Sequence, residues 1–133
     1  DIPVYQLSLD YGASPQTHLE MGRYLKALRD HGVMVLGSGN VVHNLQLINW
    51  NGGAYDWALE FDKYVHTKLD NRDFTALANF QSLGQLAKLA HPTYDHYLPL
   101  LPILGLVEDE DEIFTFNDSI DLGSVSMRSF VAA

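Results

Sequence analysis

The first 36 residues constrain the fold most strongly, because they follow the pattern strand, helix, strand with short connections. Residues 2–9 are rich in β-forming side chains, and a helix follows that opens with Ser14 as its cap and Pro15 in its first turn. Residues 33–36 are a short apolar run between two glycines, which is typical of a buried strand. Two strands joined through a helix usually form a parallel pair with a right-handed crossover. The pattern therefore predicts a βαβ unit over residues 2–36.

The rest of the chain predicts further helices and two closing strands. Apolar residues recur at helical spacing over 54–69 and 73–90, and prolines punctuate an apolar run over 97–106, so that helix is kinked or begins late. Alternation over 113–116 and 124–131 predicts strands. The expected fold is α/β: a mixed sheet with an N-terminal βαβ unit and flanking helices. The predicted core includes Met21, Leu25, Leu28, Val33, Val35, Leu100 and Leu104.

Length and composition limit the chain to one domain and exclude several classes of function. The 133 residues carry 8 basic and 17 acidic side chains, and a net charge of −9 argues against nucleic acid or an anionic membrane surface as a partner. No apolar run approaches the roughly 20 residues that span a bilayer. The absence of cysteine excludes disulfides, thiolate metal sites and cysteine nucleophiles. It is also typical of the cytoplasm, where we expect this protein.

The histidines are the residues best able to carry chemistry in this chain. Three of the six lie on predicted helices, where exposed or capping roles are ordinary: His18, His31 and His66. His43 follows a glycine-containing loop beyond the predicted strand 33–36, at the sheet edge where α/β folds place ligands. An imidazole there can accept a proton or bind a metal, and a hydrogen-bonded loop histidine is the alternative. His91 and His96 lie five positions apart and share no helical face, so only one is expected at a common site.

Two segments contain the remaining histidine motifs: residues 37–45 read GSGNVVHNL, and residues 92–101 read PTYDHYLPLL. They resemble the paired motifs of class III (LigB-type) extradiol ring-cleavage dioxygenases, in the branch of the DOPA dioxygenases. The spacing of 53 positions between His43 and His96 fits this family, and weaker similarities extend over essentially the whole chain.

The resemblance implies one non-haem Fe(II) or Zn(II) ion, a small aromatic diol of the catechol type as substrate, and O₂ as co-substrate. His96 matches the family's C-terminal metal ligand. His43 matches the histidine that faces the substrate as acid and base, and that approaches the metal in some zinc-loaded members. Ser38 and Asn44, in the same motif, are expected to contact the substrate. The motif does not require His91, which is expected outside the site.

The family is about twice as long as this chain, and its two other histidine ligands come from an N-terminal half without a counterpart here. Residues 1–133 are therefore expected to be the C-terminal portion of a larger catalytic domain, with that half as a partner and an oligomer as an open alternative. Val4, Leu7, Trp50 and Trp57 are candidates for uncovered apolar surface. Two other classes of function remain: a non-catalytic relative that acts in binding or assembly, and an unrelated α/β binder of small molecules. The two histidine motifs argue against the unrelated binder.

Overall fold

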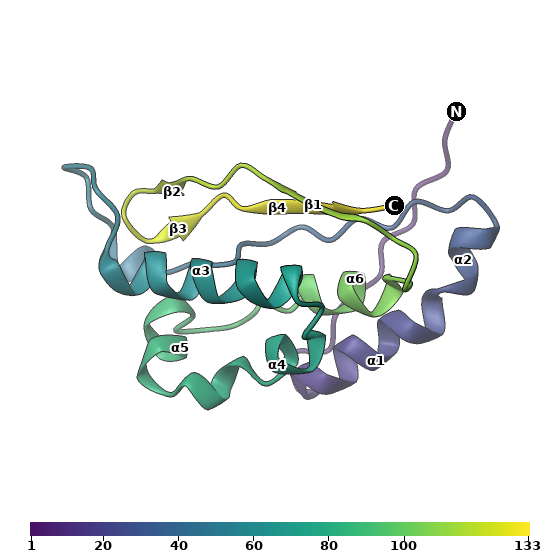
Figure 1. Cartoon of the computed structure of the whole chain (residues 1–133), viewed down its shortest axis with the longest axis horizontal. Coiled ribbons are helices and arrows are strands. Elements are labelled where there is room, and N and C mark those ends of the chain that lie inside the picture. Colours follow the sequence, from purple (N-terminus) through teal and green to yellow (C-terminus); the bar gives the residue numbers. More distant parts are fainter.

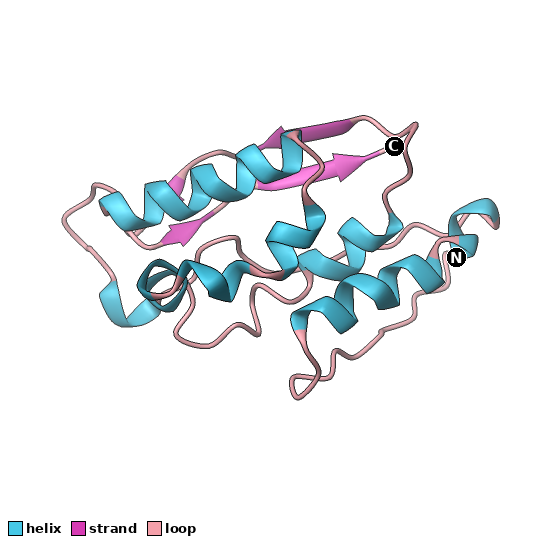
Figure 2. Cartoon of the chain, turned by 60° about the horizontal axis from the view of Figure 1, so that its bottom comes forward, coloured by secondary structure: helices cyan, strands magenta, loops and turns pink.

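Short strands lie along one side of helices α3 and α6, and helices α1, α4 and α5 lie on the other side (Figures 1 and 2). The computed structural model describes all residues from 1 to 133. The α-helices are α1 (Pro15–Leu25), α2 (Ala27–Asp30), α3 (Asp56–Asp70), α4 (Phe74–Ala78), α5 (Gln85–Ala90) and α6 (Leu100–Leu106). The 3-10 helices are η1 (Leu45–Leu47) and η2 (Phe80–Leu83), and the strands are β1 (Ile113–Phe116), β2 (Ile120–Asp121), β3 (Val125–Ser126) and β4 (Ser129–Ala132). None of the helices has the length and apolar character needed to cross a membrane.

The strands form two separate antiparallel pairs, β1 with β4 and β2 with β3. The strand predicted at 113–116 is confirmed. The strand predicted at 124–131 is divided into β3 and β4. The division falls at Arg128, whose backbone N–H donates to the Ser126 hydroxyl, while its guanidinium pairs with the buried Asp62 carboxylate of α3 at 2.6 Å. The side chain that interrupts the strand therefore anchors the sheet to α3.

The predicted βαβ unit does not form, because neither 2–9 nor 33–36 is a strand in this structure. Extended backbone is stable only when a neighbouring strand satisfies its polar groups, and nothing in this chain pairs with either segment. Most of their apolar side chains consequently face solvent, and Ile2 and Tyr5 are 91% and 92% exposed. Val33, expected in the core, is also exposed, and Val35 is half-buried.

Helix α1 packs on α6 through a face that differs from the predicted one. Its buried residues are His18, Leu19 and Gly22. Of the residues predicted as core, Leu104 is buried, Met21, Leu25 and Leu100 are half-buried, and Leu28 is exposed. The reason is the close approach of the two helices at Gly22 and Gly105, where a Cβ on Gly105 would overlap the Leu19 carbonyl oxygen and lie 2.8 Å from the Gly22 Cα. The close approach of the two backbones therefore determines which face of α1 is buried, and the widest apolar stripe of the helix does not.

Gly105→Ala should lower the free energy of unfolding by about 1–3 kcal/mol, because the added methyl group must push α1 away from α6. Urea denaturation of the protein measures this effect. Gly12→Ala is the matched control, since a Cβ there meets only the Asp10 side chain, at 3.2 Å. Equal effects of the two substitutions would show that the helix contact does not require glycine.

The helix predicted around 54–69 is confirmed as α3, whereas the one predicted over 73–90 is divided into α4, η2 and α5. Asp73 caps α4 by accepting a hydrogen bond from the Ala76 N–H at 3.2 Å. Gly84 ends η2 with φ of 60°, a conformation that favours glycine. The breaks bring Phe80 and Leu77 into the core beside α3.

An ion pair closes the C-terminal end of α2. The Arg29 guanidinium donates two hydrogen bonds to the Asp111 carboxylate, at 2.6 and 2.7 Å, and Arg72 also donates to the Asp111 carbonyl. The bond from Arg29 is the main reason that the pKa of Asp111 falls from 3.8 to about 2. The pair ties α2 and the end of α3 to the turn that precedes β1.

Acid should weaken the fold through Asp111. Because its pKa is lower in the folded state, its contribution is complete above pH 3.8 and is lost as the pH falls toward 2. The free energy of unfolding should therefore fall more steeply between pH 4 and pH 2 in the wild type than in Asp111→Asn. Urea midpoints measured at several pH values test this, and parallel profiles for the two proteins would contradict it.

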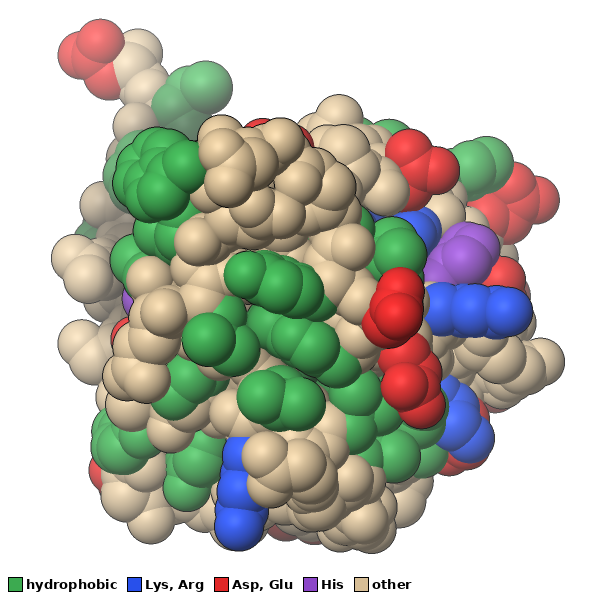
Figure 3. Space-filling view, turned by 90° about the vertical axis from the view of Figure 1, so that its left-hand side faces the viewer, with side chains coloured by type: hydrophobic (Ala, Val, Ile, Leu, Met, Phe, Trp, Pro, Cys, Tyr) green, Lys and Arg blue, Asp and Glu red, His purple; other side chains and the backbone are tan.

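Apolar side chains are also exposed at the end of the molecule where the loop between η1 and α3 meets the β2–β3 turn. Figure 3 views this end and shows hydrophobic side chains gathered near its centre. Exposed apolar residues in η1, in this loop and in the turn are Leu45, Leu47, Trp50 and Leu122. Trp50 is 79% exposed, and Val4 and Leu7 are exposed as well. Trp57 differs from the expectation, since it is half-buried and stacked on Tyr55 at 5.6 Å.

Candidate active site

Two segments distant in sequence, 37–44 and 90–99, meet at the candidate site. The Asn40 N–H donates to the His96 carbonyl, and the His43 N–H donates to the Ala90 carbonyl, each at 2.9 Å. Gly39 lies so close to the His96 carbonyl that a Cβ would overlap that oxygen. The glycine is therefore required for the approach of the two backbones.

The segment that carries His43 is held from a second side by the turn and strand around β3. The Ser126 N–H donates to the Val42 carbonyl at 2.9 Å, and the Asn44 N–H donates to the Ser124 carbonyl at 3.1 Å. His43 itself forms an isolated antiparallel bridge with Val125. Hydrogen bonds on both sides fix the backbone of His43, which limits the positions that its ring can take.

The structure brings the imidazoles of His43 and His96 together. Their ring centroids lie 3.6 Å apart and their planes differ by 10°, so the rings are stacked. Burial, and then the neighbouring His96, lower the pKa of His43 below its ordinary value of 6.5, although Asp95 opposes this shift. The imidazole of His43 is consequently neutral at pH 7 and able to accept a proton.

His96 has a carboxylate next to one of its ring nitrogens. Its Nδ1 atom lies 2.9 Å from Asp95 Oδ2, without the alignment of a hydrogen bond. A hydrogen bond from the Thr93 side chain is the largest cause that lowers the pKa of Asp95, and His96 adds to it. Asp95 is therefore ionised at neutral pH. A carboxylate on Nδ1 leaves Nε2 as the nitrogen available to a metal.

The other predicted substrate contacts, Ser38 and Asn44, differ in exposure. Ser38 is exposed on the loop. Asn44 is only 4% exposed: its Nδ2 donates to the Leu89 carbonyl at 2.7 Å, and its Oδ1 accepts from the Gln46 N–H at 3.1 Å. These bonds give Asn44 a role in holding the backbone beside His43. Contact of either residue with substrate stays a prediction.

The remaining histidines lie outside the stacked pair. His91 is 3% exposed, bonds through Nε2 to the Val41 carbonyl at 2.7 Å, and has its pKa lowered to about 4, chiefly by burial. His18 is buried, with Nδ1 2.9 Å from the Ser14 carbonyl, rather than exposed. His31 is exposed, and His66 lies 3.6 Å from Asp70. The burial of His91 depends on contacts with distant aromatic residues, which no local pattern indicates.

The stacked pair fits one metal ligand from this chain. The structure contains no group of three or more histidine and carboxylate side chains that could hold a metal ion. The lone pair of an imidazole lies in the ring plane, and a bound metal lies about 2 Å from the nitrogen in that plane. Because the two rings are nearly parallel and 3.6 Å apart, a metal in the plane of one ring is displaced from the plane of the other. In this arrangement one of the two rings can bind a metal ion while the other stays free of it.

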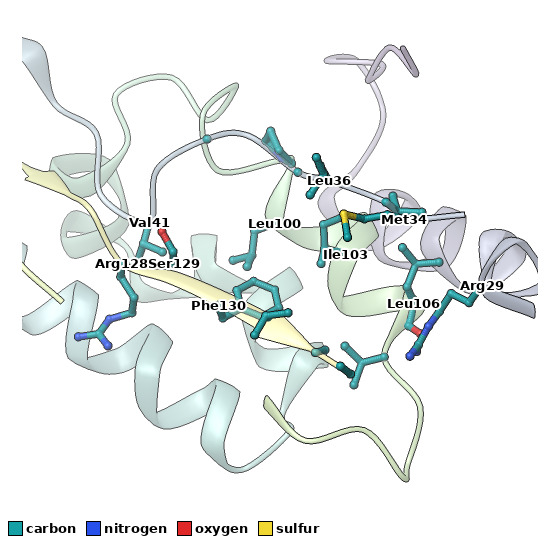
Figure 4. Close-up of a pocket in the computed structure, with 18 of the residues that line it drawn as sticks. Arg29, Met34, Leu36, Val41, Leu100, Ile103, Leu106, Arg128, Ser129 and Phe130 are labelled. Atoms are coloured by element: carbon teal, nitrogen blue, oxygen red, sulfur yellow. The ribbon is translucent and has the colours of Figure 1, made fainter. Parts of the chain in front are cut away.

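His96 also lines an apolar cleft of about 550 Å³. Figure 4 shows this cleft between residues 34–41, helix α6 and strand β4, with Leu36, Ile103 and Phe130 among the side chains that line it. Its wall includes the apolar residues of 33–36 that pair with no strand.

Residues 1–124 match the family described as "Catalytic LigB subunit of aromatic ring-opening dioxygenase", and the chain belongs to this family. It is similar to the 4,5-DOPA dioxygenase extradiol of Escherichia coli (strain K12), with 42% identity over 97% of this chain and 49% of that protein. It is also similar to the 4,5-DOPA dioxygenase extradiol of Portulaca grandiflora, with 33% identity over 98% of this chain and 49% of that protein.

The solved structure of uncharacterized protein JW3007 from Escherichia coli K12 has a similar fold. Its TM-score is 0.85 and its sequence identity is 39%, over 92% of this chain and 52% of that chain. The chain thus spans about half the length of the curated relatives it matches. Membership of the family of LigB-type, DOPA dioxygenase-like proteins is established by these matches.

Proposed function

We propose that this chain carries part of the active site of a metal-dependent extradiol dioxygenase, which opens the ring of a catechol-type substrate with O₂. The observation that carries the proposal is the stacked pair of His43 and His96 on the two segments that resemble the family's motifs. The names of the family and of the relatives support the class of reaction. A cytoplasmic location accords with the absence of cysteine.

In this proposal His96 holds Fe(II) or Zn(II) through Nε2, while the Asp95 carboxylate orients the ring from Nδ1. A non-haem Fe(II) ion supplies open coordination positions for the oxygens of a catechol and for O₂. His43 is neutral at pH 7, so it takes a proton from a catechol hydroxyl at a ring nitrogen, keeps it, and returns it to an oxygen of the opened product. Because the two rings are stacked, His43 can accept a proton next to His96 without itself binding the metal.

We propose further that the site is completed by polypeptide corresponding to the N-terminal half of the relatives. The chain contributes one ligand, and a non-haem iron that keeps open positions needs several. The unpaired apolar segments 2–9 and 33–36 provide a surface on which another part of the same protein can pack. An exposed apolar surface of this kind promotes association, so the isolated chain is expected to self-associate.

Oxygen uptake and product formation from a catechol test the proposal on the complete protein loaded anaerobically with Fe(II). We expect one O₂ consumed per ring opened. The isolated 133-residue chain, treated identically, should open no ring. Robust turnover by the isolated chain would contradict the need for a further half. A complete protein that binds metal but opens no ring would instead favour a non-catalytic relative that acts in binding or assembly.

A further inference from the structure

His91 belongs to neither ring of the stacked pair, yet it contacts the segment that carries His43. Its Nε2 lies 2.7 Å from the Val41 carbonyl oxygen. A carbonyl oxygen only accepts, so Nε2 carries the proton and Nδ1 is left with a lone pair. That Nδ1 is buried and has no hydrogen-bond partner. The bond from Nε2 is therefore the polar contact that determines the orientation of the buried His91 ring, because Nδ1 has no partner.

Aromatic side chains enclose the His91 ring. Phe61, Phe80 and Tyr97 meet it edge-on, with centroid distances of 5.5, 6.2 and 5.0 Å. These rings come from α3, η2 and the turn before α6, so the core of the molecule sets the place of His91. The hydrogen bond from His91 to the Val41 carbonyl therefore fixes the segment that ends in His43 relative to the core.

Three hydrogen bonds join residues 40–43 to residues 90–96. Two of them link backbone groups: Asn40 to the His96 carbonyl and His43 to the Ala90 carbonyl, both 2.9 Å long. The third is the bond from His91 to Val41, and it alone among the three is made by a side chain. A substitution at His91 therefore removes this side-chain hydrogen bond and leaves the donors and acceptors of the two backbone hydrogen bonds in place.

We propose that His91 is a positioning residue for proton transfer at His43: its bond to the Val41 carbonyl holds the His43 ring in its stacked position against His96. His91 touches no substrate in this role, and the inference rests on the proposed function. A displacement of about 1 Å at a group that transfers a proton can reduce the rate about 100-fold. Through the bond from His91 to Val41, the packing of the core thus determines the position of the His43 imidazole.

Four variants of the complete protein separate this role from a merely structural one. His91→Leu and His91→Met fill the apolar space without a donor, whereas His91→Gln keeps an N–H donor on a side chain of similar reach. Tyr64→Phe is the matched control, because it removes the hydrogen bond from the Tyr64 hydroxyl to the Ala76 carbonyl, 3.0 Å long, and leaves both His91 and Val41 untouched.

The donor-free variants should lower kcat about 10- to 100-fold with KM changed less than about twofold, and His91→Gln should recover kcat to within about threefold of the wild type. Tyr64→Phe should leave kcat unchanged. A fall in kcat of the same size in Tyr64→Phe, or no recovery in His91→Gln, would overturn the proposal. If His91→Leu does not fold, the more adaptable His91→Met provides the comparison.

A spectroscopic measurement decides the role of His91 independently of activity. With the histidine rings isotopically labelled, nuclear Overhauser contacts between His43 and His96 should be present in the wild type, His91→Gln and Tyr64→Phe, and lost in the donor-free variants. Retention of these contacts in His91→Leu or His91→Met would overturn the inference. A wild-type protein that shows the contacts but opens no ring would contradict the proposed function alone.

Discussion

Replacing His43 by Gln in the complete protein should lower kcat for ring cleavage about 10²- to 10⁴-fold while the metal content stays unchanged. The amide of glutamine has a size and polarity close to imidazole but does not take up a proton near neutral pH. In the proposed function the wild-type ring takes up this proton; it is stacked on His96, and its pKa is lowered below 6.5, mainly by burial.

Steady-state kinetics over a range of pH provide the measurement. In the wild type, kcat/KM should fall as the pH drops below 6.5, because His43 becomes protonated and no longer accepts a proton. This acid limb should be absent from the residual activity of His43→Gln. His66→Gln is the matched control, since that ring lies on α3 and its nearest acidic partner is Asp70 at 3.6 Å. A variant at position 43 with full activity would show that another group handles the proton.

Replacing His96 by Gln should remove the metal from the complete protein and abolish activity. Loss of a residue that only supports a ligand weakens metal binding about 10- to 100-fold, so loss of the ligand itself should exceed about 100-fold. The prediction follows from the free Nε2 of His96 and from the Asp95 carboxylate 2.9 Å from Nδ1. Metal content after dialysis, determined by elemental analysis, and direct titration with Fe(II) or Zn(II) measure the effect.

The pair of variants distinguishes the two histidines. Because the parallel rings allow one of them to bind a metal at a time, His43→Gln should keep the metal and His96→Gln should lose it. His31→Gln is the control for the second substitution, since that residue is exposed at the end of α2. Equal metal loss in the variants at positions 43 and 96 would show that both rings bind the metal after a rearrangement of the stacked pair.

The sequence determined the features that depend on neighbouring residues. Ser14 caps α1 by accepting from the Thr17 N–H at 3.1 Å, and the helical spacing of apolar residues in α3 appears in the structure at nearly the predicted position. The motif at 37–45 also predicts a functional role for His43, whose ring the structure stacks on that of His96. Helix capping and apolar periodicity depend on residues within one or two turns, so the local sequence is enough to predict where these helices form.

Tertiary structure alone decided which apolar faces were buried and which strands formed. The face of α1 on α6 follows from the contact of Gly22 with Gly105, two residues 83 positions apart. Segments 2–9 and 33–36 have the composition of strands but form none, because a strand needs a partner and this chain supplies no partner to either. His91 became a core histidine and His96 a partner of His43 through contacts between distant segments. Local sequence cannot determine these outcomes, since their energies arise from surfaces that meet only in the folded molecule.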